Sequence, residues 1–353
     1  MDIIIPCAGT SSRFPNMRPK YLLADYRSQR MIELAAAPYL SKHTVHAVIL
    51  EQHEKQHGVS QTFKDIFGDS VNIVTLPEPT RGPVETVYEC LKEIDLDPKS
   101  GFMIHYCDSM FECNVTAGSN SIFVDNINDH YQFRTSADKA YVNVNDQGMV
   151  TCITESKIIG DLFCVGGYQF SSKYTYMRAF DDLRLSVANE VPMSTMINHL
   201  IDMGEDFTVA KVSKSVEFAT AEDWERWNDR PTIFCDIDGT LVHNQSPYGI
   251  NSYESEPVIL KNNVDAMLAA QARGCQIIFT TGRSYKWITA TMKMLDDLGF
   301  NKDYRLVMDL HHARRILIND YAPTNPYPSA VAINIKRDDD CLDQLMKNQS
   351  HYF

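Results

Sequence analysis

The sequence predicts an α/β fold of two domains, each a mainly parallel sheet flanked by helices. Short runs rich in β-branched residues alternate with helical patterns along the chain, which is typical of α/β architecture. A chain of 353 residues also exceeds the usual size of one domain. A polar helical pattern stops at Pro231, and a new strand begins at Thr232. We therefore expect domains at residues 1–229 and 230–353.

The composition excludes some classes of function. With 44% hydrophobic residues the chain can bury ordinary cores, which excludes wholesale disorder. A net charge of −13 argues against a nucleic-acid partner, because general nucleic-acid binders carry basic stripes. The nine cysteines show no spacing suited to zinc.

No apolar run reaches the roughly 18 residues of a membrane span, so we expect no membrane insertion. The opening "MDIIIPC" lacks the basic region and long apolar core of a signal peptide. We therefore expect a cytoplasmic protein. The sequence leaves its oligomeric state open, a homo-oligomer included.

The first predicted strand, Ile3–Pro6, leads into a loop of small residues from Ala8 to Ser12. Small residues let backbone N–H groups surround a phosphate, and Arg13 and Lys20 add positive charge. The G-x-x-x-x-G-K-[ST] order of a Walker loop is missing. From these residues alone, a nucleotide-binding loop and an ordinary surface loop both remain open.

Further motifs follow in the first domain. "PTRGPVETVYECL" predicts a loop and a helix, and "GFMIHYCDSMF" predicts a strand that ends just before Asp108. A carboxylate at a strand end is either a solvated cap or a metal ligand. "TESK" and "VGGYQFSS" come next, and "VEFATAEDW" near the end of the domain carries Glu217.

The order of these motifs resembles the nucleotidyltransferases that make activated sugars, whose signature is A-G-x-G-[ST]-R followed by P-K. Ser11 stands where the family has its second glycine. The resemblance implies a Rossmann-like fold and nucleotidyl transfer from CTP or another nucleoside triphosphate to a phosphorylated sugar or polyol. It assigns phosphate binding to Ala8, Gly9, Ser12, Arg13 and Lys20, nucleobase contact to Gly82 and Thr86, Mg²⁺ binding to Asp108 and Glu217, and acceptor contact to Glu155 and Lys157.

The second domain opens with "TIFCDIDGTLVHN", in which Asp236 and Asp238 end an apolar strand. Residues two apart point to the same face of a strand, so both carboxylates converge on one small volume. A divalent cation relieves their repulsion, and Mg²⁺ prefers oxygen ligands. Two further predicted strands, Gln276–Thr280 and Ile316–Ile318, lead to Thr281 and Asp320. Polar side chains at strand ends suit a phosphoryl site at the carboxyl edge of a parallel sheet.

This second set of motifs resembles the haloacid dehalogenase-type phosphatases. The resemblance implies that Asp236 attacks phosphorus to form an aspartyl-phosphate, and that Asp238 acts as acid and base. It also implies that Thr281 binds the phosphoryl oxygens, and that Mg²⁺ is held by Asp236, Asp320 and the backbone carbonyl of Asp238. The lysine that the family places before its last acidic motif is missing from "LVMDLHHARRILIND", which leaves Arg315, Arg314 or Lys286 to replace it.

Spacing limits what covers the second site. Only 41 residues lie between Gly239 and Thr281, and 38 between Thr281 and Asp320. Domains usually need roughly 50 residues or more, so we expect no large cap.

The two resemblances together predict a bifunctional, Mg²⁺-dependent enzyme that makes a nucleotide-linked building block, as in capsule or surface-glycan precursor synthesis. One half transfers a nucleotidyl group and releases pyrophosphate, and the other hydrolyses a phosphomonoester. An alternative keeps the phosphatase but makes the first domain a non-catalytic nucleotide- or sugar-binding module.

Overall fold

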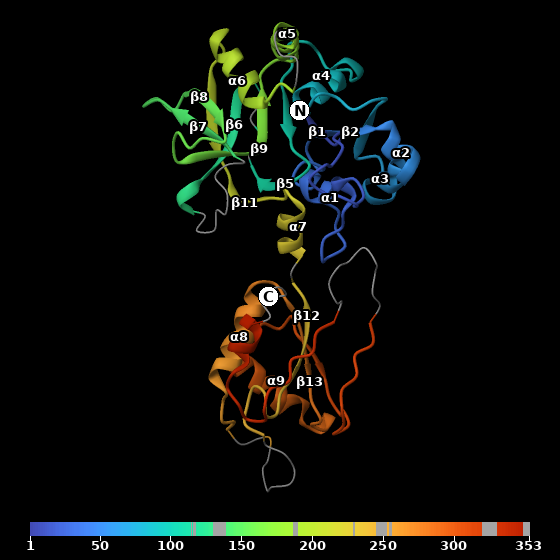
Figure 1. Cartoon of the computed structure of the whole chain (residues 1–353), viewed down its shortest axis with the longest axis vertical. Helices are drawn as coiled ribbons and strands as arrows, with labels where there is room; N and C mark the ends of the chain where they lie inside the picture. The colour runs from blue at the N-terminus through green and yellow to red at the C-terminus, as the bar shows by residue number, and fades with distance from the viewer. Residues whose placement is uncertain are drawn as a thin grey trace. The chain divides into compact units, whose positions relative to one another are not determined.

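The computed structural model describes residues 1–113, 115, 118–129, 139–185, 190–228, 230–244, 253, 256–319 and 330–348. The chain forms two compact units, Met1–Trp224 and Glu225–Phe353, and the division falls inside helix α7 (Ala221–Asn228) (Figure 1). Each unit has its own sheet and its own hydrophobic core.

The first unit is built on a sheet with the strand order β10-β6-β9-β4-β1-β2-β3. Strands β4, β1, β2 and β3 are mutually parallel, whereas β9 runs antiparallel to β4 and β6. The strands of this path are β1 (Asp2–Pro6), β2 (Thr44–Leu50), β3 (Val71–Leu76), β4 (Phe102–His105), β6 (Asn120–Asn126), β9 (Leu162–Phe170) and β10 (Phe207–Lys211). The prediction of a mainly parallel sheet is confirmed here.

Shorter strands extend this sheet or lie beside it. Strands β7 (Ala140–Val144) and β8 (Val150–Glu155) form an antiparallel pair that continues from β9. Strands β5 (Ser109–Glu112) and β11 (Ser213–Glu217) form a separate antiparallel pair. The second pair matters for function because β5 begins directly after Asp108.

Helices cover both faces of the sheet, so successive side chains of β1 enter two different cores. Ile4 packs with residues of α4, α5 and α6, whereas Ile3 and Ile5 pack with residues of α1 and α3. A strand buried on both faces reads as a continuous apolar run, as "DIIIP" does. The helices of this unit are η1 (Lys20–Leu22), α1 (Met31–Ala36), α2 (Glu51–His57), α3 (Val59–Phe67), α4 (Pro83–Glu93), η2 (Ile127–Asp129), α5 (Lys173–Arg184) and α6 (Met193–Asp202).

The second unit contains a parallel sheet in the order β12-β13-β14 among its described residues. Helices α8 and α10 supply buried side chains to its core, together with α9. The elements are β12 (Thr232–Asp236), α8 (Lys261–Ala272), β13 (Gln276–Thr280), η4 (Tyr285–Trp287), α9 (Ile288–Asp297), β14 (Arg305–Val307) and α10 (Leu342–Asn348). Asp236 pairs with Thr280, so both strands end at the same edge.

One predicted strand is absent from the described residues. The predicted strand Ile316–Ile318 is not in a sheet, and the side chain of Ile318 is 90% exposed. A run of apolar residues indicates β-propensity but does not supply a pairing partner. The third strand of the sheet is instead β14, which the sequence pattern did not indicate.

Candidate active sites

The carboxyl ends of β1 and β4 bring the small-residue loop and Asp108 together. The two strands are parallel neighbours, with Asp2 opposite Phe102 and Ile4 opposite Ile104. The loop after β1 and the turn after β4 therefore leave the sheet at the same edge. Here the Lys20 Nζ donates a hydrogen bond to Asp108 Oδ2 at 2.5 Å. Two residues that lie 88 positions apart in the sequence thus form one ion pair.

Ser11 has a backbone conformation that favours glycine. Its φ is +53°, in the left-handed region that costs a non-glycine residue about 1–2 kcal/mol. The Ser11 Oγ accepts a hydrogen bond from the Lys20 N–H at 3.1 Å, and the Ser11 carbonyl accepts one from Phe14 N–H at 2.8 Å. The serine therefore holds the loop against Lys20 by a bond that glycine lacks.

Asp108 and Lys20 are both charged at neutral pH. Burial alone raises the pKa of Asp108, but the Lys20 ammonium and its hydrogen bond outweigh burial and leave that pKa below its usual value. Burial likewise lowers the pKa of Lys20, and the Asp108 carboxylate outweighs it, so the pKa of Lys20 lies above its usual value. Arg13 is exposed on the same loop, and its charge acts on both groups.

Glu217 lies on the strand next to Asp108. In the antiparallel pair of β5 and β11, Glu217 is opposite Ser109, and Phe218 N–H donates to the Asp108 carbonyl at 2.7 Å. The Glu217 carboxylate forms an ion pair with Lys139, a residue that the sequence analysis did not single out. Lys139 precedes β7 without any recognisable motif, so its position was not available from the pattern.

The predicted acceptor residues occupy the end of β8. Glu155 is the last residue of β8, opposite Ala140, and Ser156 N–H donates to the Lys139 carbonyl at 2.8 Å. Burial raises the pKa of Tyr106 well above its usual value, and the charges of Glu155 and Asp108 add to the effect. The charges of Glu155 and Asp108 thus both act on Tyr106. Lys157 is exposed, and no hydrogen bond or ion pair joins it to the other described residues.

The predicted nucleobase loop is held by its own threonines. Gly82 has φ +127°, and a Cβ there would lie 2.6 Å from Glu190 Cγ, so only glycine fits without a shift of that side chain. Thr86 is buried, and its hydroxyl bonds to Thr80 Oγ1 at 2.6 Å and to the Gly82 carbonyl at 3.1 Å. Thr86 therefore holds the loop at Thr80–Gly82 in place through bonds inside the protein. Ala8 is buried, whereas Gly9 and Ser12 are exposed.

In the second unit, Asp238 is held by a residue that the motif reading missed. The Arg283 Nη2 donates to Asp238 Oδ1 at 2.7 Å, and Arg283 Nε donates to Oδ2 at 2.9 Å. The Arg283 side chain is fully buried, with its guanidinium 4.5 Å from the ring centroid of Tyr253. A bidentate pair of this kind fixes the direction of the carboxylate. The signal was present in "TTGR", because Arg283 follows Thr281 and Gly282 directly.

Thr281 joins the same network. Its Oγ1 donates to Asp238 Oδ2 at 3.1 Å and accepts from Arg283 N–H at 3.0 Å. Both bonds of this hydroxyl are therefore made within the protein, and its predicted bond to a phosphoryl oxygen stays a prediction.

Asp236 differs from Asp238 in its surroundings. Asp236 lies at the surface, yet partial burial of its carboxyl and the neighbouring Asp238 charge raise its pKa to about 6, against the opposing charges of Arg315 and Arg337. The neighbouring carboxylates of Asp236 and Asp238 form an electronegative position. They fit a magnesium ion, which needs only one or two carboxylates besides water and phosphate oxygens.

Of the residues that the structure describes, the other predicted members of this site lie outside the hydrogen-bond network of Asp238, Thr281 and Arg283. Arg315 donates from Nη1 to the carbonyls of His311 and Ala313, at 2.7 and 2.8 Å. Lys286 lies over the ring of Trp287, 5.2 Å from its centroid. Arg314 is exposed. Asp320 lies outside the described residues. Within the described part of the chain, no group of three or more His, Cys, Asp or Glu residues forms a metal cluster.

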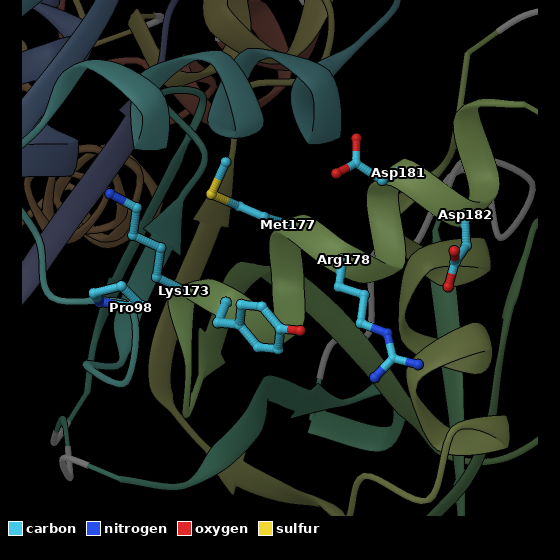
Figure 2. A pocket seen from close by; sticks show the side chains of 7 residues that line it. Pro98, Lys173, Met177, Arg178, Asp181 and Asp182 are labelled. Atoms are coloured by element: carbon cyan, nitrogen blue, oxygen red, sulfur yellow. The ribbon is translucent and has the colours of Figure 1, made fainter.

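A separate pocket of about 380 Å³ lies along α5. Figure 2 shows Met177, Arg178, Asp181 and Asp182 projecting from this helix. Pro98, which lines the pocket, precedes β4, whereas Asp108 follows it. The pocket is therefore at the opposite end of β4 from the Lys20–Asp108 pair and is not part of that site.

The comparisons with known proteins agree with this division. Residues 233–303 match the family of haloacid dehalogenase-like hydrolases, a stretch that includes Asp236, Asp238, Thr281 and Arg283. No curated protein matches the chain at a significant level of similarity. None of the helices in the described part of the chain is long and apolar enough to cross a membrane.

Solved structures resemble the N-terminal region. A nucleoside-diphosphate-sugar pyrophosphorylase from Vibrio cholerae RC9 is similar with a TM-score of 0.54 and 19% identity, over 64% of this chain and 98% of that one. An inositol-1-phosphate CTP transferase from T. maritima is similar with a TM-score of 0.51 and 12% identity, over 63% and 90%. The first unit therefore has the fold of nucleotidyltransferases, joined to a haloacid dehalogenase-like unit.

Proposed function

We propose that the chain is a bifunctional enzyme, with nucleotidyl transfer in the first unit and phosphomonoester hydrolysis in the second. The observation that carries the proposal is the same in both units. Strand-end aspartates and basic side chains meet at the carboxyl edge of a parallel sheet, as Lys20 and Asp108 do in one and Asp238 and Arg283 in the other. This edge is where α/β proteins bind phosphorylated ligands.

In the first unit, an acceptor phosphate oxygen attacks the α-phosphorus of a nucleoside triphosphate and displaces pyrophosphate. Lys20 and Arg13 offset the charge on the phosphates, and the loop from Ala8 to Ser12 offers backbone N–H groups. Glu155 and Lys157 contact the acceptor, and Gly82 contacts the base. No protein nucleophile takes part, so positioning and electrostatics supply the rate enhancement.

The names of the similar proteins support this class of substrate. One is described as a nucleoside-diphosphate-sugar pyrophosphorylase and the other as an inositol-1-phosphate CTP transferase. A phosphorylated sugar or polyol as acceptor suits both names, and CTP is part of the second. A role in capsule or surface-glycan precursor synthesis is consistent with that product.

In the second unit, the Asp236 carboxylate attacks phosphorus and forms an aspartyl-phosphate. Asp238, which Arg283 holds, starts this cycle in its protonated form, gives its proton to the leaving oxygen, and then takes one back from the water that attacks the aspartyl-phosphate. Bound Mg²⁺ would neutralise phosphate charge in both units. Asp108 and Glu217 would hold it in the first unit, and Asp236 with the Asp238 carbonyl and Asp320 in the second.

A panel of triphosphates and phosphorylated acceptors tests the proposal, with pyrophosphate and inorganic phosphate measured separately. We expect pyrophosphate release with one triphosphate–acceptor pair and hydrolysis of p-nitrophenyl phosphate that requires Mg²⁺. Asp108→Asn should abolish only the first activity and Asp236→Asn only the second. Phosphate release that survives Asp236→Asn would reject Asp236 as the nucleophile.

One observation favours a second candidate function. Glu217 is already paired with Lys139, and the resemblance needs that carboxylate for a metal. A first unit without catalysis would bind nucleotide or sugar and serve the phosphatase. If nucleotide binds but no acceptor supports pyrophosphate release, the binding module is the correct assignment.

A further inference from the structure

The segment Lys336–Asp340 lies against the turn that follows the Asp236 strand. The Asp338 N–H donates to the Gly239 carbonyl at 2.9 Å, and Asn244 N–H donates to Asp338 Oδ1 at 2.7 Å. The segment itself turns, because Asp339 N–H donates to the Lys336 carbonyl at 3.0 Å. Asp338 has φ +62°, a left-handed conformation that these bonds hold in place.

This turn presents Arg337 to the site. A Cβ built on Gly239 would lie 2.9 Å from Arg337 Cγ and 3.7 Å from its Cδ, so the arginine stem crosses directly over the glycine. Gly239 follows Asp238, and its φ of +88° independently requires glycine. The sequence therefore provides a glycine where the arginine passes.

The N–H donors of the Arg337 guanidinium are available to a ligand. It makes no hydrogen bond with any other residue that the structure describes, and Arg337 is exposed. Arg283, in contrast, is committed to Asp238, and one nitrogen of Arg315 is committed to two backbone carbonyls. Gly239, over which the Arg337 stem passes, directly follows Asp238 and lies three residues after Asp236.

We propose that Arg337 binds the phosphoryl group of the substrate at Asp236, as the cation of a site that has no lysine in its expected place. This inference rests on the proposed phosphatase function and adds a residue to it. A guanidinium offers two parallel N–H donors to a phosphoryl group and stays charged at every working pH. The same contact would hold the aspartyl-phosphate and released phosphate.

The test uses the full chain with Mg²⁺, p-nitrophenyl phosphate as substrate and orthovanadate as a phosphate analogue. In Arg337→Gln, the KM for the substrate and the inhibition constant for vanadate should each rise about 10–100-fold, the value of a charge-assisted hydrogen bond. Arg337→Lys should recover part of the loss. The neighbouring exposed Lys336→Gln removes a charge from the same turn and should stay within about twofold on both measures.

Two further measurements distinguish the loss of a phosphate contact from misfolding. The thermal midpoint of the second unit in Arg337→Gln without ligand should equal that in the wild type, which excludes misfolding, and vanadate binding by calorimetry should weaken with the inhibition constant. If the wild type is active but Arg337→Gln binds vanadate with wild-type affinity, the inference about Arg337 is wrong. The same holds if only Arg315→Gln weakens vanadate binding. Neither outcome affects the proposed phosphatase function. A wild type that neither hydrolyses the substrate nor binds vanadate overturns the phosphatase function as well.

Discussion

At the residue scale, Arg283 makes the clearest prediction, because it is a buried cation with a dedicated partner. Its two bonds to Asp238 require the planar fork of a guanidinium. Arg283→Lys keeps the charge but loses this geometry, so we expect a loss of about 1–3 kcal/mol in the free energy of unfolding. Phosphatase kcat should fall at least tenfold (about 1.4 kcal/mol), since Asp238 is no longer held in one direction.

The matched control for that variant is Arg273→Lys, at the exposed end of α8. Surface changes of this kind stay within about 0.5 kcal/mol. Urea denaturation and steady-state kinetics on both variants give the comparison. Equal behaviour of the two would mean that the Arg283–Asp238 pair does not position the carboxylate.

Asp236 predicts a pH-dependent stability. Its pKa of about 6 in the folded chain lies above the usual value near 3.9, so folding disfavours the charged form. The destabilisation is therefore present above about pH 6 and vanishes below about pH 4. Asp236→Asn should raise the thermal midpoint of the second unit at pH 8 in the absence of metal, and the gain should disappear towards pH 4.

Magnesium provides the complementary measurement for this residue. At pH 8, added Mg²⁺ should raise the midpoint of the wild type more than that of Asp236→Asn. As pH falls through 6, protonation of Asp236 competes with the metal, and the Mg²⁺ effect should fade. An Asp236→Asn midpoint that is unchanged at pH 8 contradicts the electrostatic account.

At the element scale, the loop after β1 owes its shape to one serine. Ser11→Ala keeps the left-handed strain and loses the bond to Lys20 N–H, so it should cost about 1–2 kcal/mol. Ser11→Gly loses the same bond but relieves the strain, and should be about 1 kcal/mol more stable than Ser11→Ala. Chemical denaturation of both variants decides, and equal stabilities would show that the backbone strain is not real.

The turn at Gly239 gives a second element-scale prediction. A methyl group there meets both the left-handed φ and the Arg337 stem, whereas Gly299 has a similar φ of +96° and nothing closer than 3.9 Å. Gly299→Ala therefore measures conformational strain alone, about 1–2 kcal/mol. Gly239→Ala should cost more and should also weaken vanadate binding. Identical costs would mean that the close approach is absent.

Local sequence patterns predicted the positions of strands better than they predicted which segments pack together. Strand β13 has the bounds predicted for it, Gln276–Thr280, since a short run rich in β-branched and aromatic residues is a local signal. The helical sequence pattern covers Met31–Tyr39, but helix α1 ends at Ala36, because helix ends depend on the following turn. The motifs also predicted that Lys20 and Asp108 share a site. The positions of Arg337 and Lys139 could not be predicted, because a sequence pattern does not show which distant segments pack together.

At the scale of the whole molecule, the two units have separate hydrophobic cores. Two independent cores predict two unfolding transitions rather than one. Ligands that bind only the folded state raise the transition of their own unit. Vanadate with Mg²⁺ should therefore shift one transition, and the matching nucleoside triphosphate the other, in differential scanning calorimetry. A single transition that both ligands shift together contradicts this independence.

The position of Arg337 in the chain has a consequence for biosynthesis. The turn at Gly239 leaves the ribosome long before the segment Lys336–Asp340 that closes over it. A nascent chain therefore carries the acidic turn without its arginine until almost all of the second unit has been translated. Premature stop codons after α9 should produce proteins that still transfer nucleotides but no longer release phosphate, so nonsense alleles of this gene would separate the two activities genetically.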